Sequence, residues 1–252
     1  MLYRISCISA ILFLFAACQS GTPGQQNQDS IPASTSTPVT TTAGEPVTGS
    51  YQGTLPCADC PGIDYQLSLY EDSSYQAITA YQGRGNNIAE VTTGKWTQAA
   101  DTVLVQDGKV IRRFLAGAHQ LTQLDGSGQV ITGALASYYI LKHVEGGGNH
   151  TYLREKAQSG VSFMANGNEP GWSLEINKKQ LLFRNMNGDS LSAPLPAANP
   201  NTDTLKTYTS GKLKVSIRNT MCMDDMSGFM SPCSVQVEAN DKTYRGCGQY
   251  IK

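Results

Sequence analysis

Cys57 and Cys60 form the one Cys-x-x-Cys pair of this 252-residue sequence, and they are flanked by Pro56 and Pro61. Two thiols at this spacing could form a disulfide, act as a redox pair or bind a soft metal ion. Asp59 lies between them, but its carboxylate is a hard ligand that a soft metal does not prefer. The chemistry of the pair therefore depends on the structure around it.

The residues that follow the pair bear on this choice. Thiol oxidoreductases lower a cysteine pKa at a helix N-terminus, whereas Pro61-Gly62 leads into a run that predicts a strand. A disulfide that closes so short a loop contributes roughly 2 kcal/mol by loop entropy. We therefore expect a Cys57–Cys60 disulfide. The alternative is a Cu(I) site in which the two reduced cysteines are the ligands.

A second group of sulfur-bearing residues lies between positions 221 and 233. Thioethers are soft ligands that suit Cu(I), but methionine also fills irregular gaps in hydrophobic cores. The segment is therefore a second candidate copper site, and core packing is the alternative. Its candidate ligands are Met221, Met223, Met226, Met230 and Cys233.

The other cysteines of this region predict a longer disulfide. A disulfide between Cys222 and Cys247 would close a longer loop and, by the same loop-entropy argument, would contribute roughly 3–4 kcal/mol to the stability of the fold. Cys233, at every-second-residue spacing with Val235 and Val237, lies with them on the apolar side of a predicted strand. We expect it to be a buried free thiol, and a Cys233–Cys247 bridge is the alternative.

The N-terminus has the pattern of a secretory signal peptide. Arg4 precedes the apolar run 5–17, which is too short to span a bilayer as a helix. Residues 15–18 resemble the lipobox of bacterial lipoproteins, which implies removal of residues 1–17 and lipidation of Cys18. Ordinary secretion with cleavage nearby is the alternative. By resemblance to lipoprotein sorting rules, Gln19 favours the outer membrane, facing either the periplasm or the cell surface.

Composition supports an extracytoplasmic, tethered protein. Residues 18–46 are rich in Ser, Thr, Pro, Gly and Gln, so we interpret them as a disordered tether. An oxidising compartment makes disulfides the expected state of paired cysteines. The formal net charge is −1, and the sequence has no basic field that would indicate nucleic-acid binding.

The rest of the chain reads as two β domains. In residues 47–144, Ile63, Tyr65, Leu67 and Leu69 alternate with polar residues, which predicts a strand with one solvent-exposed face. Seven or eight such strands at hairpin spacing predict a small closed antiparallel barrel. The glycines in segment 145–158 indicate a linker. Residues 159–252 then predict a second small β-rich domain, so the fold class is all-β.

Residues 53–63 (GTLPCADCPGI), with Tyr75, residues 81–83 (YQG) and residues 94–96 (GKW), resemble the N-terminal domain of the NlpE family. The resemblance covers about residues 49–142. It implies a lipocalin-like barrel, a link to copper tolerance and a role in envelope-stress signalling through a sensor protein. Residues 167–172 and 222–247 resemble a different, uncharacterised family of bacterial envelope domains, which implies no activity.

These features predict an outer-membrane-anchored lipoprotein that senses or binds at the cell envelope. Its expected partners are the membrane, through the lipid anchor, and an envelope sensor protein, with copper as the one candidate cofactor. A lipocalin-like carrier of a small apolar ligand is the alternative. We do not expect an enzyme, because His119, His143 and His150 lack a zinc-binding spacing and no nucleophile elbow or phosphate loop occurs.

Overall fold

A computed structural model describes residues 47–107, 110–146 and 150–251. These residues form two successive antiparallel β assemblies, which confirms the predicted all-β class. The predicted signal peptide 1–17, the predicted lipidation site Cys18 and the predicted tether 18–46 lie outside the described residues. None of the helices within the described part is both long and apolar enough to cross a membrane.

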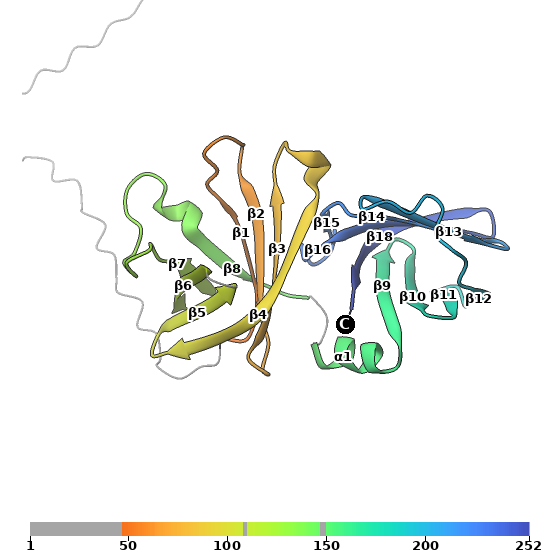
Figure 1. Cartoon of the computed structure of the whole chain (residues 1–252), viewed down its shortest axis with the longest axis horizontal. Helices are drawn as coiled ribbons and strands as arrows, with labels where there is room; N and C mark the ends of the chain where they lie inside the picture. The colour runs from red at the N-terminus through yellow and green to blue at the C-terminus, as the bar shows by residue number, and fades with distance from the viewer. Residues whose placement is uncertain (1–46, 108–109, 147–149, 252) are drawn as a thin grey trace, which may run out of the picture. The chain divides into compact units, whose positions relative to one another are not determined.

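The first assembly is a closed eight-stranded barrel (Figure 1). Each strand pairs with the next, and the last strand returns to the first through the pairs Ser50–Val144, Tyr51–His143 and Gln52–Lys142. Two short 3-10 helices, η1 (Gly85–Asn87) and η2 (Ala136–Tyr139), lie in its connections. The strands are β1 (Gly49–Leu55), β2 (Ile63–Leu69), β3 (Ser74–Tyr81), β4 (Ala89–Ala99), β5 (Thr102–Asp107), β6 (Val110–Gly117), β7 (Gln120–Gln123) and β8 (Ile140–Val144).

Side chains from alternate positions along the strands fill the inside of this barrel. Tyr65, Leu67 and Leu69 of β2 point inward at every second position, as the sequence predicts. They pack with aromatic and aliphatic side chains from other strands, including Phe114 and Leu141, both fully buried. The interior is therefore a packed hydrophobic core.

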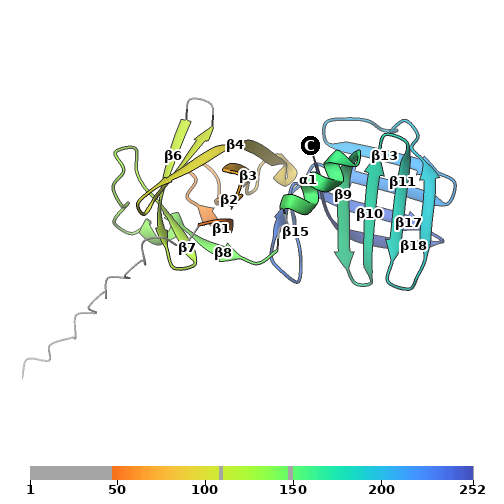
Figure 2. The same ribbon diagram turned by 90° about the horizontal axis from the view of Figure 1, so that it is seen from below.

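The second assembly is an eight-stranded sheet that follows a nine-residue helix, α1 (His150–Gln158). Segment 145–158, interpreted as a linker, thus contains a helix, which contacts β9 and lies beside it in Figure 2. The sheet has the order β12-β11-β10-β9-β18-β17-β14-β13. Its strands are β9 (Val161–Asn168), β10 (Gly171–Asn177), β11 (Gln180–Asn185), β12 (Ser190–Pro194), β13 (Leu205–Ser210), β14 (Leu213–Arg218), β17 (Cys233–Ala239) and β18 (Lys242–Tyr250).

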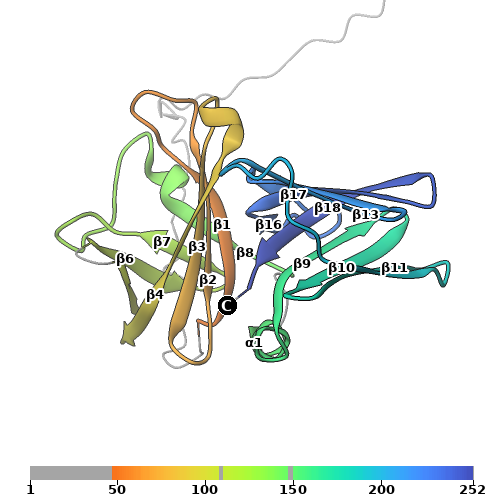
Figure 3. The same cartoon turned by 45° about the vertical axis from the view of Figure 1, so that its right-hand side comes forward.

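This sheet curves so that its two ends face each other across a single core. Figure 3 shows β9, β10 and β11 on one side and β13, β17 and β18 on the other. The core contains Leu174 and Phe183 from the first side and Val215 and Val237 from the second. A two-stranded ribbon, β15 (Cys222–Met223) and β16 (Met230–Ser231), precedes β17.

The outer face of β2 differs from the prediction. The sequence predicts that Gln66 and Ser68 are exposed to solvent, but both are buried. Gln66 is buried because segment 221–230 covers it: its side chain hydrogen-bonds to the backbone of Met230, and Ile78 of β3 packs against Met230. Alternation predicted the direction of these side chains correctly, but it carried no information about a covering segment far along the chain.

Candidate functional site

The Cys-x-x-Cys loop joins β1 to β2 at one end of the first barrel. The Sγ atoms of Cys57 and Cys60 are 2.03 Å apart, at disulfide distance, and their Cα atoms are 5.3 Å apart. The backbone of β2 begins at Ile63, so a strand follows the pair. Both sulfurs lie near oxygen atoms, Cys57 Sγ at 3.6 Å from Asp59 Oδ1 and Cys60 Sγ at 3.3 Å from the Gly62 carbonyl.

The side chain of Arg84 contacts the middle of this loop. The guanidinium group of Arg84 forms an ion pair with the Asp59 carboxylate and donates a hydrogen bond of 3.2 Å to the Asp59 carbonyl. The pair is exposed to solvent, so screening limits its contribution to stability. Its effect is positional, because it fixes Asp59 beside the two sulfurs.

The same loop is the one His, Cys, Asp and Glu cluster with metal-binding geometry among the described residues. One ligand atom from each of Cys57, Asp59 and Cys60 lies within 4.8 Å of the others. The oxidised sulfurs are weak ligands, whereas reduction would provide two soft thiolates that suit Cu(I). The residues present therefore fit a soft metal ion in the reduced state.

The second predicted copper site has a different character. Met230 is fully buried and Cys233 is buried, whereas Met226 is 79% exposed. Met221 packs against a hydrophobic cluster formed by Ile78, Ala89 and Met230. Metal binding by Met221, Met223, Met226, Met230 and Cys233 stays a prediction, and core packing accounts for the two methionines of the cluster.

The remaining cysteines lie at the start of β15, in β17 and in β18. The Sγ atoms of Cys222 and Cys247 are 2.03 Å apart and close a loop across 25 positions. Cys233 has a free thiol, and burial raises its pKa to about 11. A thiol with so high a pKa is a poor nucleophile at neutral pH.

The structure brings together the two motifs that distinguish the second assembly. The Asn168 side chain donates a 2.8 Å hydrogen bond to Asp224, which joins segment 167–172 to segment 222–228. Trp172 Nε1 donates to the Arg245 carbonyl at 3.1 Å, directly over Gly167. A Cβ atom at Gly167 would lie 2.2 Å from this nitrogen, so the close approach requires glycine. These residues therefore have a clear structural role.

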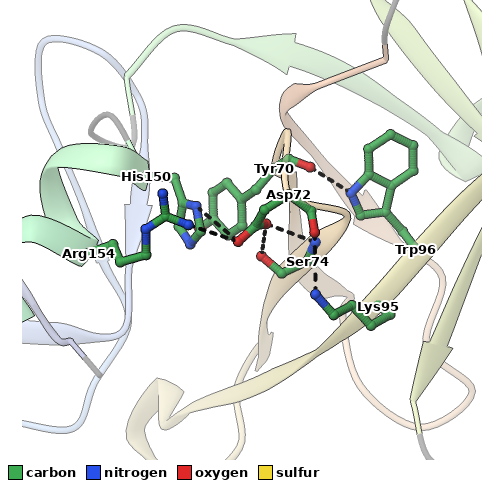
Figure 4. A network of polar contacts seen from close by, with 7 residues as sticks. All are labelled: Tyr70, Asp72, Ser74, Lys95, Trp96, His150 and Arg154. Carbon is green, nitrogen blue, oxygen red and sulfur yellow. Dashed lines mark hydrogen bonds and ion pairs between the residues drawn. The ribbon is translucent and has the colours of Figure 1, made fainter.

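A polar network connects the β2–β3 turn with α1 (Figure 4). The Asp72 carboxylate accepts hydrogen bonds from Ser74, and its Oδ2 lies 4.0 Å from His150 Nδ1 and 3.5 Å from Arg154 Nη1. The imidazole ring of His150 stacks on Tyr70, with ring centres 3.8 Å apart and planes 7° apart.

The electrostatics of the network follow from these contacts. The hydrogen bonds from Ser74 lower the pKa of Asp72, and nearby His150 and Lys95 add to the effect. Burial raises the pKa of Tyr70 to about 12, so its hydroxyl is neutral at physiological pH. The amino-acid sequence did not predict this network, because no local pattern relates Asp72 to a helix almost 80 positions later.

Comparison with known families identifies the first barrel. Residues 51–134 match the family of the NlpE N-terminal domain, and the match includes the Cys57–Cys60 loop, Arg84 and Asp72. The first barrel is an NlpE N-terminal domain. This confirms the resemblance predicted from residues 53–63. His150 and Arg154, the α1 partners of Asp72, lie beyond the matched part of the NlpE domain.

Individual proteins are also similar to parts of this chain. The lipoprotein NlpE of Escherichia coli K12 is 33% identical over 89 residues, which is 34% of this chain and 38% of NlpE. The matched part thus spans less than half the length of that relative. Among solved structures, a putative lipoprotein from Shewanella oneidensis is 37% identical and covers 38% of this chain and 87% of its own, with a TM-score of 0.35. The Cpx pathway activator NlpE from E. coli is 17% identical, covers 81% and 95%, and has a TM-score of 0.32.

Proposed function

We propose that this protein is a lipid-anchored lipoprotein of the bacterial outer membrane that senses envelope conditions through its NlpE domain. The observation that carries the proposal is the family match over residues 51–134, which contains the Cys57–Cys60 loop. The relatives are named as lipoproteins, which supports the anchor expected at Cys18. We propose a binding and signalling role and no enzymatic activity.

The partner is proposed by analogy. E. coli NlpE is described as a Cpx pathway activator, which implies a sensor protein that receives its signal. We extend this to a sensor of a two-component pathway as the partner of this chain. The exposed loop around Asp59 and Arg84 is the part of the NlpE domain where a change in cysteine chemistry would alter the surface presented to such a partner.

A test in the native bacterium separates sensing from a purely structural loop. Overproduction of the wild-type protein should activate an envelope-stress reporter, and the double variant Cys57→Ser/Cys60→Ser should reduce the response to copper or surface contact. Asp101→Asn, an exposed acidic residue elsewhere on the barrel, is the matched surface control. Equal responses from the wild type and the double variant, at equal protein level, would remove the loop from the signalling mechanism.

Copper is proposed as a ligand of the reduced loop. When bound, the metal would be held by the thiolates of Cys57 and Cys60, with Asp59 beside them. Competition with a Cu(I) chelator under a dithiol reductant should show one site that is lost in Cys57→Ser/Cys60→Ser and kept in Cys233→Ser. Unchanged copper affinity in the double variant would contradict this part of the proposal.

The carrier alternative is less well supported. A carrier of the lipocalin type holds its ligand inside the barrel. Here the inside contains a core of buried side chains that includes Tyr75, Phe114 and Leu121. This packing favours a sensor or binding protein whose contacts are made by its outer surface and loops.

A further inference from the structure

A large cleft lies outside the barrel interior, on the outer face of β3 and β4. Its volume is about 920 Å³, within the range of small-molecule binding sites. The other walls come from α1, from segment 202–206 before and within β13, and from the end of β18. Neither the proposed signalling role nor the Cys57–Cys60 loop uses this cleft.

One part of the cleft is apolar. Val91 on β4 is 43% exposed and Tyr250 on β18 is 42% exposed, and both line the cleft together with Leu153 and Leu205. The Tyr250 ring is held in place by an edge contact with Phe163, at 4.9 Å between ring centres. A hydrocarbon chain that covered these large apolar side chains would remove apolar surface from water, which would make its binding favourable.

The charged side chains of the cleft favour an anion. Lys95, Arg154 and Lys206 line it, against two carboxylates, Asp72 and Asp203. Asp72 already interacts with Ser74, His150 and Arg154. Lys206 has its Nζ atom 5.0 Å from the centre of the Tyr250 ring and, among the described residues, no ion-pair partner. A cation thus stands directly beside the apolar wall.

We propose that this cleft binds a long-chain fatty acid, with its hydrocarbon chain against Val91 and Tyr250 and its carboxylate at Lys206. The combination of an apolar wall with an adjacent lysine matches the two ends of such a molecule. A neutral lipid would leave Lys206 without a partner, and a small anion would leave the apolar wall uncovered.

The test measures binding of cis-parinaric acid, a fluorescent fatty acid. It uses the mature-length chain 18–252 with Cys18→Ser, so that no detergent competes for the probe. We expect saturable binding, with the methyl ester of the same acid bound about tenfold more weakly and acetate unable to displace the probe. Equal affinity for the acid and its ester, or no saturable binding, would overturn the proposal.

Matched variants locate the site. Val91→Ser should weaken binding about tenfold, whereas Val110→Ser, an exposed valine on β6, should leave it unchanged. Lys206→Gln should weaken binding about fivefold at low salt, whereas Lys212→Gln should not. Circular dichroism verifies that each variant is folded. If neither cleft variant changed the affinity while both remained folded, the bound probe would lie elsewhere and the proposal would be wrong.

Discussion

The fully buried side chain of Gln66 pairs with the backbone of Met230 as a neighbouring strand would. Its Nε2 donates to the Met230 carbonyl at 3.0 Å, and its Oε1 accepts from the Met230 N–H at 2.8 Å. A buried backbone group that loses its partner costs the free energy of its desolvation. The amide of Gln66 therefore satisfies two backbone groups of a segment that lies 164 positions later in the sequence.

We predict that Gln66→Ala lowers the free energy of unfolding by about 2–4 kcal/mol, because both Met230 groups lose their partner. Urea denaturation measures the difference. Gln98→Ala, which removes an exposed glutamine from β4, should change it by less than about 0.5 kcal/mol. Equal effects of the two substitutions would show that the hydrogen bonds to Met230 do not matter for stability.

The thiol of Cys233 should make stability depend on pH in the alkaline range. Burial raises its pKa from the usual 9.0 to about 11, so the folded protein holds this proton more tightly than the unfolded chain. The contribution is present below pH 9 and is lost as the pH rises towards 11. We predict that the wild type loses more stability than Cys233→Ala between these values, measured by urea denaturation. Parallel curves for the two proteins would contradict the prediction.

At the scale of elements, the sequence predicted what is local. Period-two alternation located the strand Ile63–Leu69, and the β-rich character of residues 159–252 agrees with the second sheet. The sequence did not predict α1, because glycines 146–148 suggested a linker, nor β12, whose sequence SLSAP has little apolar character. The polar network around Asp72 was also not predicted, since it depends on how distant elements pack.

The β2–β3 turn should respond to acid through Asp72. Its pKa is lowered by the hydrogen bonds from Ser74, so the folded state favours the carboxylate more than the unfolded chain does. This contribution is present above the unfolded pKa of about 3.9 and is lost as the pH falls through the lower folded value.

We predict that Asp72→Asn lowers stability at pH 7 by less than about 1 kcal/mol, since the carboxylate is partly exposed and screened. The difference from the wild type should shrink as the pH falls below the unfolded pKa, and it should vanish once the pH is well below the lowered pKa of folded Asp72, where both side chains are neutral. Glu71→Gln, which changes the adjacent exposed acid, is the control and should have little effect at either pH. A difference that persisted at low pH would assign the effect to packing.

At the scale of the whole molecule, several contacts join the NlpE domain to the second assembly. They include the Gln66–Met230 pair, the stacking of Tyr70 on His150, and a 2.8 Å hydrogen bond from the Met221 N–H to the Asn87 carbonyl. Because these contacts bury side chains that each assembly alone would expose, we expect each assembly to stabilise the other.

The two tryptophans of the chain test this coupling, because one lies in each assembly. Trp96 packs against the core of the NlpE domain, and Trp172 belongs to the core of the second sheet. The single-tryptophan variants Trp172→Phe and Trp96→Phe therefore report on one assembly each. In each variant, we predict that the change in tryptophan emission has the same urea midpoint as the loss of circular dichroism from the whole chain.

Adding Gln66→Ala should separate the two midpoints, because it removes the buried link at Met230. Two separate transitions without Gln66→Ala would mean that the assemblies unfold independently and that these contacts contribute little to the stability of either.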